Sequence, residues 1–330
     1  MIDIKLLEQL CLCNGISGDE GNVRNLIINE IKDCADDIKT DNLGNLIVFK
    51  KGKKSAKSKL MVSAHMDEVG LMVTDITSDG YLKFDEVGGI DRRVLPGKRV
   101  CVGRNGLNGV IGVKPIHLTN GDEKTAVPKM NDMYIDIGAE SREDALKYVN
   151  YGDGINFEGD FKINGKTVVT KALDDRFGCY VLINLIKSEP EYDMYFTFVV
   201  QEEVGLRGAR SAAFTVNPDF ALVIESTTAA DVAEVDVSHQ VCNLSKGATV
   251  TVMDRATVYD KEMISAAFEL AEKNNIAVQY KRAVAGGNDS GAIHQSRGGV
   301  RTLAVSLPSR YIHAPSTCLL YTSPSPRDRG

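Results

Sequence analysis

The stretch Tyr195-Phe-Thr-Phe-Val-Val200 is the most apolar run in the sequence, and Gln201 and the acidic pair Glu202-Glu203 follow it directly. Six mostly β-branched and aromatic residues are typical of a buried strand. The two carboxylates would then lie at the carboxyl end of that strand, where open α/β sheets place their functional sites. A lone acidic pair is more often a solvated loop, but two adjacent buried negative charges require a cation.

Four other apolar runs lead to residues of the same chemical kind. Residues 60–64 are followed by His65 and Asp67, residues 167–170 by Asp174 and Asp175, residues 220–224 by Glu225, and residues 301–306 by His313. Each motif has an ordinary structural explanation, such as a core histidine or a pair of helix N-caps. Their joint occurrence is much less expected by chance than any one of them.

Composition excludes several classes of protein. The chain has 330 residues, 43% of them hydrophobic and 25% charged, with a net charge of −6, which describes an ordinary globular protein and argues against a nucleic-acid or anionic-membrane partner. No apolar run is long enough to span a bilayer and the first residues do not resemble a signal peptide, so the expected compartment is the cytoplasm. The seven cysteines form no CxxC pair and are expected to be reduced and mostly buried.

The pattern of the sequence changes between Val69 and Lys166. Short β-like segments separated by glycine turns occupy this part, and only residues 141–149 look helical. The sequence therefore predicts an α/β domain made of residues 1–70 and 166–317, with a small β-rich domain, residues 71–165, inserted in it. His117 in the insert is interpreted as a surface residue, and His239 and His294 outside it are interpreted as structural residues.

The remaining histidines and carboxylates form a coherent set of two imidazoles and three carboxylates: His65, Asp174, Glu203, Glu225 and His313. Such a set suits two divalent ions, zinc or cobalt, about 3.5–4 Å apart and bridged by one carboxylate. Glu202 is left over as a general base for a bridging water. Asp67, two residues after His65, is placed to orient its imidazole.

These motifs resemble those of the M42 family of glutamyl aminopeptidases, the tetrahedral aminopeptidases, some members of which are labelled endoglucanase. The blocks that carry the resemblance are Ser63-Ala-His-Met-Asp-Glu-Val-Gly70, Ala172-Leu-Asp-Asp-Arg176, Gln201-Glu-Glu-Val-Gly205, Gly286-Gly-Asn-Asp289 and Arg310-Tyr-Ile-His-Ala-Pro315. Two positions depart from the family pattern: Glu225, where Asp is frequent, and Asn288, where Thr is commoner.

The resemblance implies an α/β/α core with a mixed sheet and specific roles for the site residues. It implies that His65 and Glu225 hold one metal, that Glu203 and His313 hold the other, and that Asp174 bridges them. By the same resemblance Asp67 steers His65, and Glu202 is the catalytic acid and base. It also implies that the insert mediates contacts in a large homo-oligomer, a dodecamer, that acts on short peptides.

Two rival interpretations remain open at this point. Carboxypeptidases and deacylases of the M20 type use a similar order of ligands, but their extra domain lies between the fourth ligand and the last histidine, whereas here it lies between Asp67 and Asp174. The other rival is a catalytically inactive scaffold subunit, against which the complete ligand set with Glu202 argues. The sequence does not indicate which N-terminal residue of a peptide substrate is preferred. Arg255, Arg297 and Arg301 are candidates for binding an acidic side chain of that residue.

The end of the chain does not fit the rest of the pattern. Residues 318–328 have no periodicity that would extend the core, and they look like the translation of a transposase sequencing adapter. We therefore expect residues 318–330 to lie outside the fold, and the native gene to diverge directly after Thr317. The resemblance implies a further C-terminal segment with a helix that packs on the catalytic domain.

Overall fold

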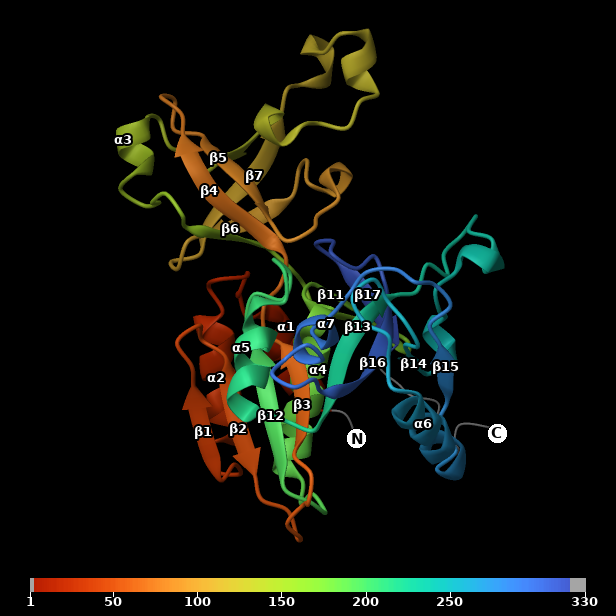
Figure 1. The fold of residues 1–330 in the computed structure, drawn as a ribbon. Helices are drawn as coiled ribbons and strands as arrows, with labels where there is room; N and C mark the ends of the chain where they lie inside the picture. The colour runs from red at the N-terminus through yellow and green to blue at the C-terminus, as the bar shows by residue number, and fades with distance from the viewer. Residues whose placement is uncertain (1–2, 321–330) are drawn as a thin grey trace.

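The computed structural model describes residues 3–320, which form a large mixed sheet between two layers of helices and a small β-barrel above one edge of it (Figure 1). The large sheet has the strand order β1 (Asp37–Thr40), β2 (Leu46–Lys50), β12 (Met194–Val199), β3 (Leu60–His65), β13 (Phe220–Thr228), β16 (Arg301–Arg310), β17 (Thr317–Leu320), β11 (Thr167–Thr170) and β10 (Lys162–Asn164). Two further strands, β14 (Ala248–Val250) and β15 (Val278–Tyr280), pair with each other, and β14 also pairs with β16. The predicted mixed-sheet α/β fold is confirmed.

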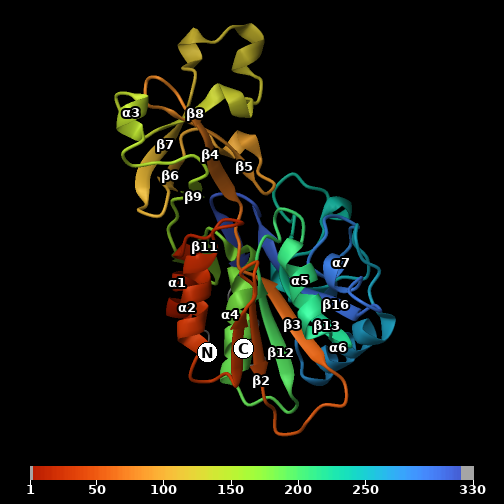
Figure 2. The ribbon, with the colours of Figure 1, turned by 60° about the vertical axis from the view of Figure 1, so that its left-hand side comes forward.

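The centre of the sheet consists of four parallel strands, β12, β3, β13 and β16. Successive side chains point to opposite faces of a strand, and the apolar run of β12 divides accordingly. Phe196 and Phe198 are fully buried in the cluster formed with α1 (Ile4–Leu12), α2 (Gly21–Ile31) and α4 (Leu173–Lys187). Val199 is buried in the opposite cluster, against α5 (Arg207–Val216) and α7 (Ser290–Ile293). The strand is hydrophobic on both faces because helices cover both (Figure 2).

Helix α6 (Lys261–Lys273) lies at the periphery, beside β16. The spacing of Met263, Ile264, Ala267, Leu270 and Ala271 predicts an amphipathic helix with these bounds and with those side chains on its buried face. The structure has the helix, but its apolar face is covered only in part. Ala271 is buried, whereas Leu270, which was expected on the buried face, is 59% exposed. Across residues 3–320, no helix combines the length and apolar composition that crossing a membrane requires.

The barrel is closed in the order β4 (Gly70–Ile76), β5 (Leu82–Val87), β8 (Met133–Asp136), β7 (Leu107–Val113), β6 (Arg99–Val102) and β9 (Gly154–Phe157). It has its own core, in which Leu71, Val100 and Ile135 are fully buried. The helix expected over residues 141–149 is shorter, α3 (Arg142–Ala145), because the chain tightens into i to i−3 turns after it. The barrel strands end at Phe157, and β10 already pairs with β11 of the large sheet.

The expectation that the chain leaves the fold at Cys318 is wrong for the first three residues. Thr317–Leu320 form β17, which pairs with β11 on one side and β16 on the other. Leu319 is fully buried in the core cluster of α1, α2 and α4. The sequence signal failed because four residues are too few to show a period, and the two neighbouring strands select the conformation. The rest of the expected tail, residues 321–330, lies outside the described residues.

Removing the Leu319 side chain tests whether this short strand is part of the core. We expect Leu319→Ala to lower the free energy of unfolding by about 2–5 kcal/mol, the usual cost of truncating a buried leucine. Leu43→Ala, at a turn position that is 47% exposed, should change it by less than about 0.5 kcal/mol. Urea titration followed by circular dichroism measures both; equal effects would contradict the assignment of β17.

Candidate active site and metal centre

The predicted site residues come together because four of the elements that carry them are parallel neighbours. His65 ends β3, Glu202 and Glu203 follow β12, Glu225 lies within β13, and His313 follows β16. The carboxyl ends of these strands meet at one edge of the sheet, as open α/β sheets require. Asp174 reaches the same edge from the first turn of α4.

Asp174 occupies the middle of the cluster. Its Oδ1 lies 3.3 Å from Nε2 of His65, and its Oδ2 lies 3.3 Å from Nε2 of His313. Beyond His65, Glu225 Oε1 is 3.4 Å from the same Nε2, and Glu203 Oε2 is 3.3 Å from Nε2 of His313. Each oxygen of one carboxylate therefore faces a separate pair of one imidazole and one carboxylate.

The ligand atoms form compact groups of a size that holds a metal ion. Within the described residues, atoms of three groups lie within 4.8 Å of one another: His65, Asp174 and Glu225; Asp174, Glu203 and His313; and His65, Glu202 and Glu203. Asp174 Oδ1 and Glu225 Oε2 are buried, and neither accepts a hydrogen bond from any residue between 3 and 320. Buried carboxylate oxygens without a donor, beside imidazole nitrogens, are the donor set that divalent zinc or cobalt prefers.

The pKa values of the cluster reflect an excess of buried negative charge. Burial, reinforced by the Asp174 carboxylate, raises the pKa of Glu203 to about 8, and burial likewise raises that of Glu225 to about 7. Burial also raises the pKa of Glu202 well above its usual range. Burial opposes a charge on His65, yet the carboxylates of Asp174, Asp67 and Glu225 raise its pKa well above normal. The site therefore attracts positive charge, which protons or metal ions can supply.

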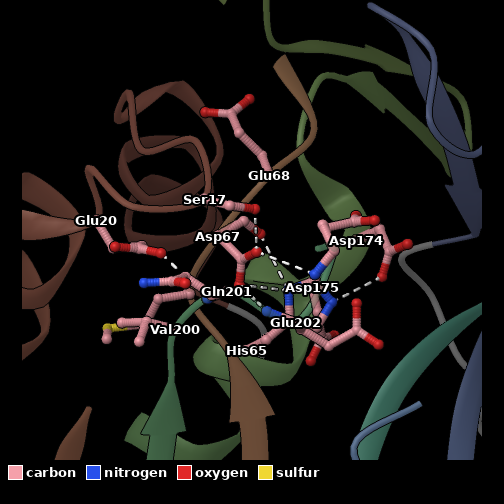
Figure 3. A network of polar contacts seen from close by, with 12 residues as sticks. Ser17, Glu20, His65, Asp67, Glu68, Asp174, Asp175, Val200, Gln201 and Glu202 are labelled. Atoms are coloured by element: carbon pink, nitrogen blue, oxygen red, sulfur yellow. Dashed lines mark hydrogen bonds and ion pairs between the residues drawn. The ribbon is translucent and has the colours of Figure 1, made fainter. Parts of the chain in front are cut away.

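Asp67 is fully buried and holds the backbone of the acidic pair (Figure 3). Its Oδ1 accepts a hydrogen bond of 3.0 Å from the amide of Glu202, and its Oδ2 accepts one of 3.1 Å from the amide of Glu203. The sequence predicts that Asp67 orients the imidazole of His65, and the contact is made mainly by the main chain of Asp67 instead of its carboxylate. Nδ1 of His65 lies 3.0 Å from the main-chain oxygen of Asp67 but 3.5 Å from its carboxylate, so the carbonyl is the closer acceptor.

Sequence reasoning missed two residues that support the site from the loop between α1 and α2. Ser17 donates a hydrogen bond of 2.6 Å to Asp67 Oδ2, and Glu20 Oε1 accepts one of 3.1 Å from the amide of Gln201. The sequence predicts two packing helices in the first forty residues, and it predicts residues 15–19 only as the loop that joins them. Nothing local identifies these residues, because their partners lie 50 and 181 positions away in the sequence.

A second missed group neutralises the charge beside the cluster. Lys171 Nζ lies 2.9 Å from Glu68 Oε1, and both residues are buried. The guanidinium of Arg176 is fully buried and donates to the main-chain oxygens of Met66, Leu10, Cys13 and Gly15. Arg176 therefore ties the end of α1 and its following loop to the segment that carries His65 and Asp67.

The inserted barrel also reaches the site. Gly88 follows β5 with a φ of +85°, and a Cβ atom added there would lie 3.2 Å from Cβ of Glu203 and 2.8 Å from Cγ1 of Val69. Only glycine combines this left-handed conformation with so close an approach. Within the described residues, none of the groups that could hold a metal includes His117, His239 or His294. His117 and His239 are exposed, whereas His294 is half-buried and its Nδ1 lies 2.8 Å from the main-chain oxygen of Ser290.

Comparison with known proteins agrees with this geometry. The model of the M42 glutamyl aminopeptidase family matches residues 44–323. The chain belongs to this family. Its members are metal-dependent aminopeptidases, and this membership excludes the M20-type alternative.

Individual relatives extend over almost the whole chain. A protein of Acetivibrio thermocellus, provisionally named as an aminopeptidase, is 44% identical over 312 residues, which cover 94% of this chain and 91% of the relative. The crystal structure of a TET aminopeptidase from a marine sediment Thaumarchaeota archaeon superposes with a TM-score of 0.92 at 33% identity, covering 98% of this chain and 92% of that one. The TET1 peptidase of Pyrococcus horikoshii, which can assemble into a tetrahedron or a large octahedral shell, gives a TM-score of 0.84 at 40% identity, covering 96% and 94%.

The hydrogen bond from Ser17 to Asp67 can be tested by removing the hydroxyl. We expect Ser17→Ala to lower the free energy of unfolding by about 1.5–3 kcal/mol, because a buried carboxylate loses one of its donors. Ser211→Ala is the matched control, since Ser211 donates 2.9 Å to Asp41 Oδ2 in a less buried position, and it should cost less than about 1 kcal/mol. Denaturant titration of both variants checks this; a smaller loss for Ser17→Ala than for Ser211→Ala would refute the supporting role.

Proposed function

We propose that this chain is a dinuclear metal-dependent aminopeptidase that removes N-terminal residues from short peptides. The observation that carries the proposal is Asp174, whose two oxygens each face one imidazole and one carboxylate. In this proposal His65 and Glu225 would hold one divalent ion, Glu203 and His313 would hold the other, and Asp174, which faces both pairs, would contribute to both. The sequence alone supports the cytoplasm as the compartment.

The donor set consists of imidazole nitrogens and carboxylate oxygens. Borderline divalent ions such as zinc and cobalt accept both kinds of ligand, so the set suits either ion. Two such ions, when bound, supply Lewis acidity that lowers the pKa of a water and polarises the carbonyl of the bond to be cleaved. The protein residues have separate tasks. Asp67 fixes the amides of Glu202 and Glu203, which sets the direction of both side chains.

Glu202 is the proposed acid and base. It accepts a proton from the water as the water oxygen bonds to the carbonyl carbon, and it donates that proton to the amine nitrogen as the C–N bond breaks. Burial raises the pKa of Glu202 well above the usual range for glutamate, and bound divalent ions would oppose that change because positive charge favours the ionised carboxylate that acts as the base.

Two isosteric variants separate the roles of the acidic pair. We expect Glu202→Gln to keep both metals and to lower kcat by about 10²–10⁴ with little change in KM, because only the proton acceptor is lost. Glu203→Gln should instead lose metal, and activity with it, because a charged ligand is removed. Elemental analysis beside steady-state kinetics measures both effects, and loss of metal from Glu202→Gln with retention in Glu203→Gln would reverse the assignment.

Hydrolysis by the unmodified protein tests the scaffold alternative. An inactive subunit would hydrolyse no aminoacyl nitroanilide after loading with zinc or cobalt, whatever its metal content. Activity of the metal-loaded protein, abolished by a chelator and restored by either ion, is the expected result.

We further propose that the chain forms a homo-oligomer, a dodecamer, through the inserted barrel. The assembly of the TET1 peptidase supports this proposal. So does the segment between β7 and β8, which extends from the barrel away from the large sheet (Figures 1 and 2). It exposes three apolar side chains, with Ile116 70%, Leu118 57% and Val127 50% accessible, and such surfaces are typical of contacts between proteins.

Charges placed on this segment should break the assembly. We expect the double variant Ile116→Asp and Leu118→Asp to yield smaller particles than the unmodified protein, because carboxylates cannot be buried without partners. Light scattering coupled to gel filtration measures the particle mass, with Leu43→Asp as a control on another surface. An unchanged mass would argue against contacts through this segment.

A further inference from the structure

A cavity of about 380 Å³ lies where the loop between α1 and α2 meets the inserted barrel. On the barrel side it is lined by β4, by the turn after β6 and by the turn before β9. Neither Glu202 nor any of the proposed metal ligands lines it. Its volume falls within the range of about 300–1,000 Å³ that is usual for sites of small molecules, so it is a candidate binding site separate from the metal centre.

Main-chain hydrogen bonds hold the barrel side of this cavity in place. The amide of Gly103 donates 2.8 Å to the carbonyl of Gly154, and the amide of Gly152 donates 2.9 Å to the carbonyl of Val73. The amide of Val73 in turn donates 3.0 Å to the carbonyl of Asp153. The two turns are therefore tied to each other and to β4, and the cavity between them and the α1–α2 loop is bounded by fixed backbone.

The α1–α2 loop is fixed against both domains. The amide of Gly15 donates 3.1 Å to Oδ1 of Asn156 in β9, and its carbonyl accepts a hydrogen bond of 3.0 Å from the amide of Glu68. This attachment places Asp19 against the barrel: a Cβ atom added to Gly154 would lie 3.8 Å from Asp19 Oδ2. The Asp19 side chain is half-buried there and lines the cavity.

Two opposite charges in the lining have no partner. Across residues 3–320, neither the Asp19 carboxylate nor the Arg104 guanidinium takes part in a hydrogen bond or an ion pair. Oδ2 of Asp153 accepts 2.8 Å from the amide of Asn150, while no residue in that part of the chain donates to its Oδ1. A half-buried carboxylate without a donor raises the free energy of the protein unless a molecule from solution supplies one.

These charges lie on neighbouring segments. Asp19 faces Gly154, whose carbonyl is bonded to the amide of Gly103, and Arg104 follows Gly103 directly. A Cβ atom added to Gly103 would lie 3.1 Å from Oδ2 of Asp153. A ligand that meets both signs of charge therefore needs its own positive and negative groups only a short distance apart.

The mixture of charges excludes simpler ligands. Asp19 and Asp153 belong to none of the groups of three metal-binding side chains found within residues 3–320, and Arg104 would repel a metal ion. The two carboxylates would repel a phosphate or another simple anion. A small zwitterion matches the lining, because a planar guanidinium binds a carboxylate with two parallel donors and a carboxylate accepts from an ammonium group.

We propose that this cavity is a second binding site, which takes a free α-amino acid. Its carboxylate binds Arg104 and its ammonium group binds Asp19 and Asp153. The half-buried Met72 of β4, which also lines the cavity, offers an apolar surface to an aliphatic side chain. The inference rests on the proposed aminopeptidase function for the source of the ligand, because that reaction releases free amino acids beside the site.

The position of the cavity connects it to the acidic pair. The loop that carries Asp19 also carries Ser17 and Glu20, which bind Asp67 Oδ2 and the amide of Gln201. Glu20 Oε1 also accepts 2.7 Å from the amide of Gly18, which lines the cavity. A released amino acid would therefore bind against the same loop that supports Glu202 and Glu203.

Hydrogen exchange followed by mass spectrometry locates the ligand without any turnover. L-Methionine at millimolar concentration should slow amide exchange of the metal-loaded protein in residues 103–106 and 150–154, the two barrel turns of the cavity. N-Acetyl-L-methionine lacks the ammonium group, and 3-(methylthio)propylamine lacks the carboxylate. Each should need at least about tenfold more ligand for the same protection, the loss expected for one charge-assisted hydrogen bond.

Three variants assign the effect to the charged residues. Arg104→Met and Asp19→Asn should each weaken the binding of L-methionine at least about tenfold. Arg104 is exposed and unpaired, so its replacement is not expected to disturb the fold. Arg93→Met is the control, because it removes another exposed arginine of the inserted domain that pairs with Asp91 and does not line the cavity; it should leave binding unchanged.

The outcomes separate this site from the proposed activity. Protection of the two turns in a protein that cleaves no nitroanilide would refute the activity and support the site. Cleavage without protection by L-methionine, or equal protection in Arg104→Met, would overturn the site and leave the activity standing. The dipeptide methionyl-methionine, measured with Glu202→Gln so that it stays intact, should bind more weakly than L-methionine; tighter binding would overturn the assignment to a free amino acid.

Discussion

Buried negative charge is the constraint on which the site depends. Parallel pairing of β12, β3, β13 and β16 brings their carboxyl ends to one edge, and the acidic residues that follow these strands are thereby forced together. Burial, and after it repulsion between neighbouring carboxylates, raises the pKa of Glu202, Glu203 and Glu225. Such an arrangement is stable only with cations in it, and the two imidazoles complete a ligand set that suits divalent ions.

The positions of the charges are secured by neutral donors and by cations outside the cluster. Ser17 and the amides of Glu202 and Glu203 hold Asp67, while Lys171 compensates Glu68. Arg176 links the end of α1 to the residues after β3 through carbonyl acceptors. The N-terminal helices therefore do more than cover the sheet, because the loop between them supplies part of the support for the acidic pair.

The sequence predicted those parts whose signals are local. The apolar run before Glu202 indicates a strand between two helical layers, and the heptad-like spacing in residues 261–273 indicates α6, because periodicity follows from burial on a regular element. The candidate ligands follow such runs, which made His65 and Glu225 identifiable. Ser17 could not be found this way, because it belongs to no motif and its partner Asp67 lies 50 positions away in the sequence. Strand β17 was missed because its neighbours, more than its own residues, decide its conformation.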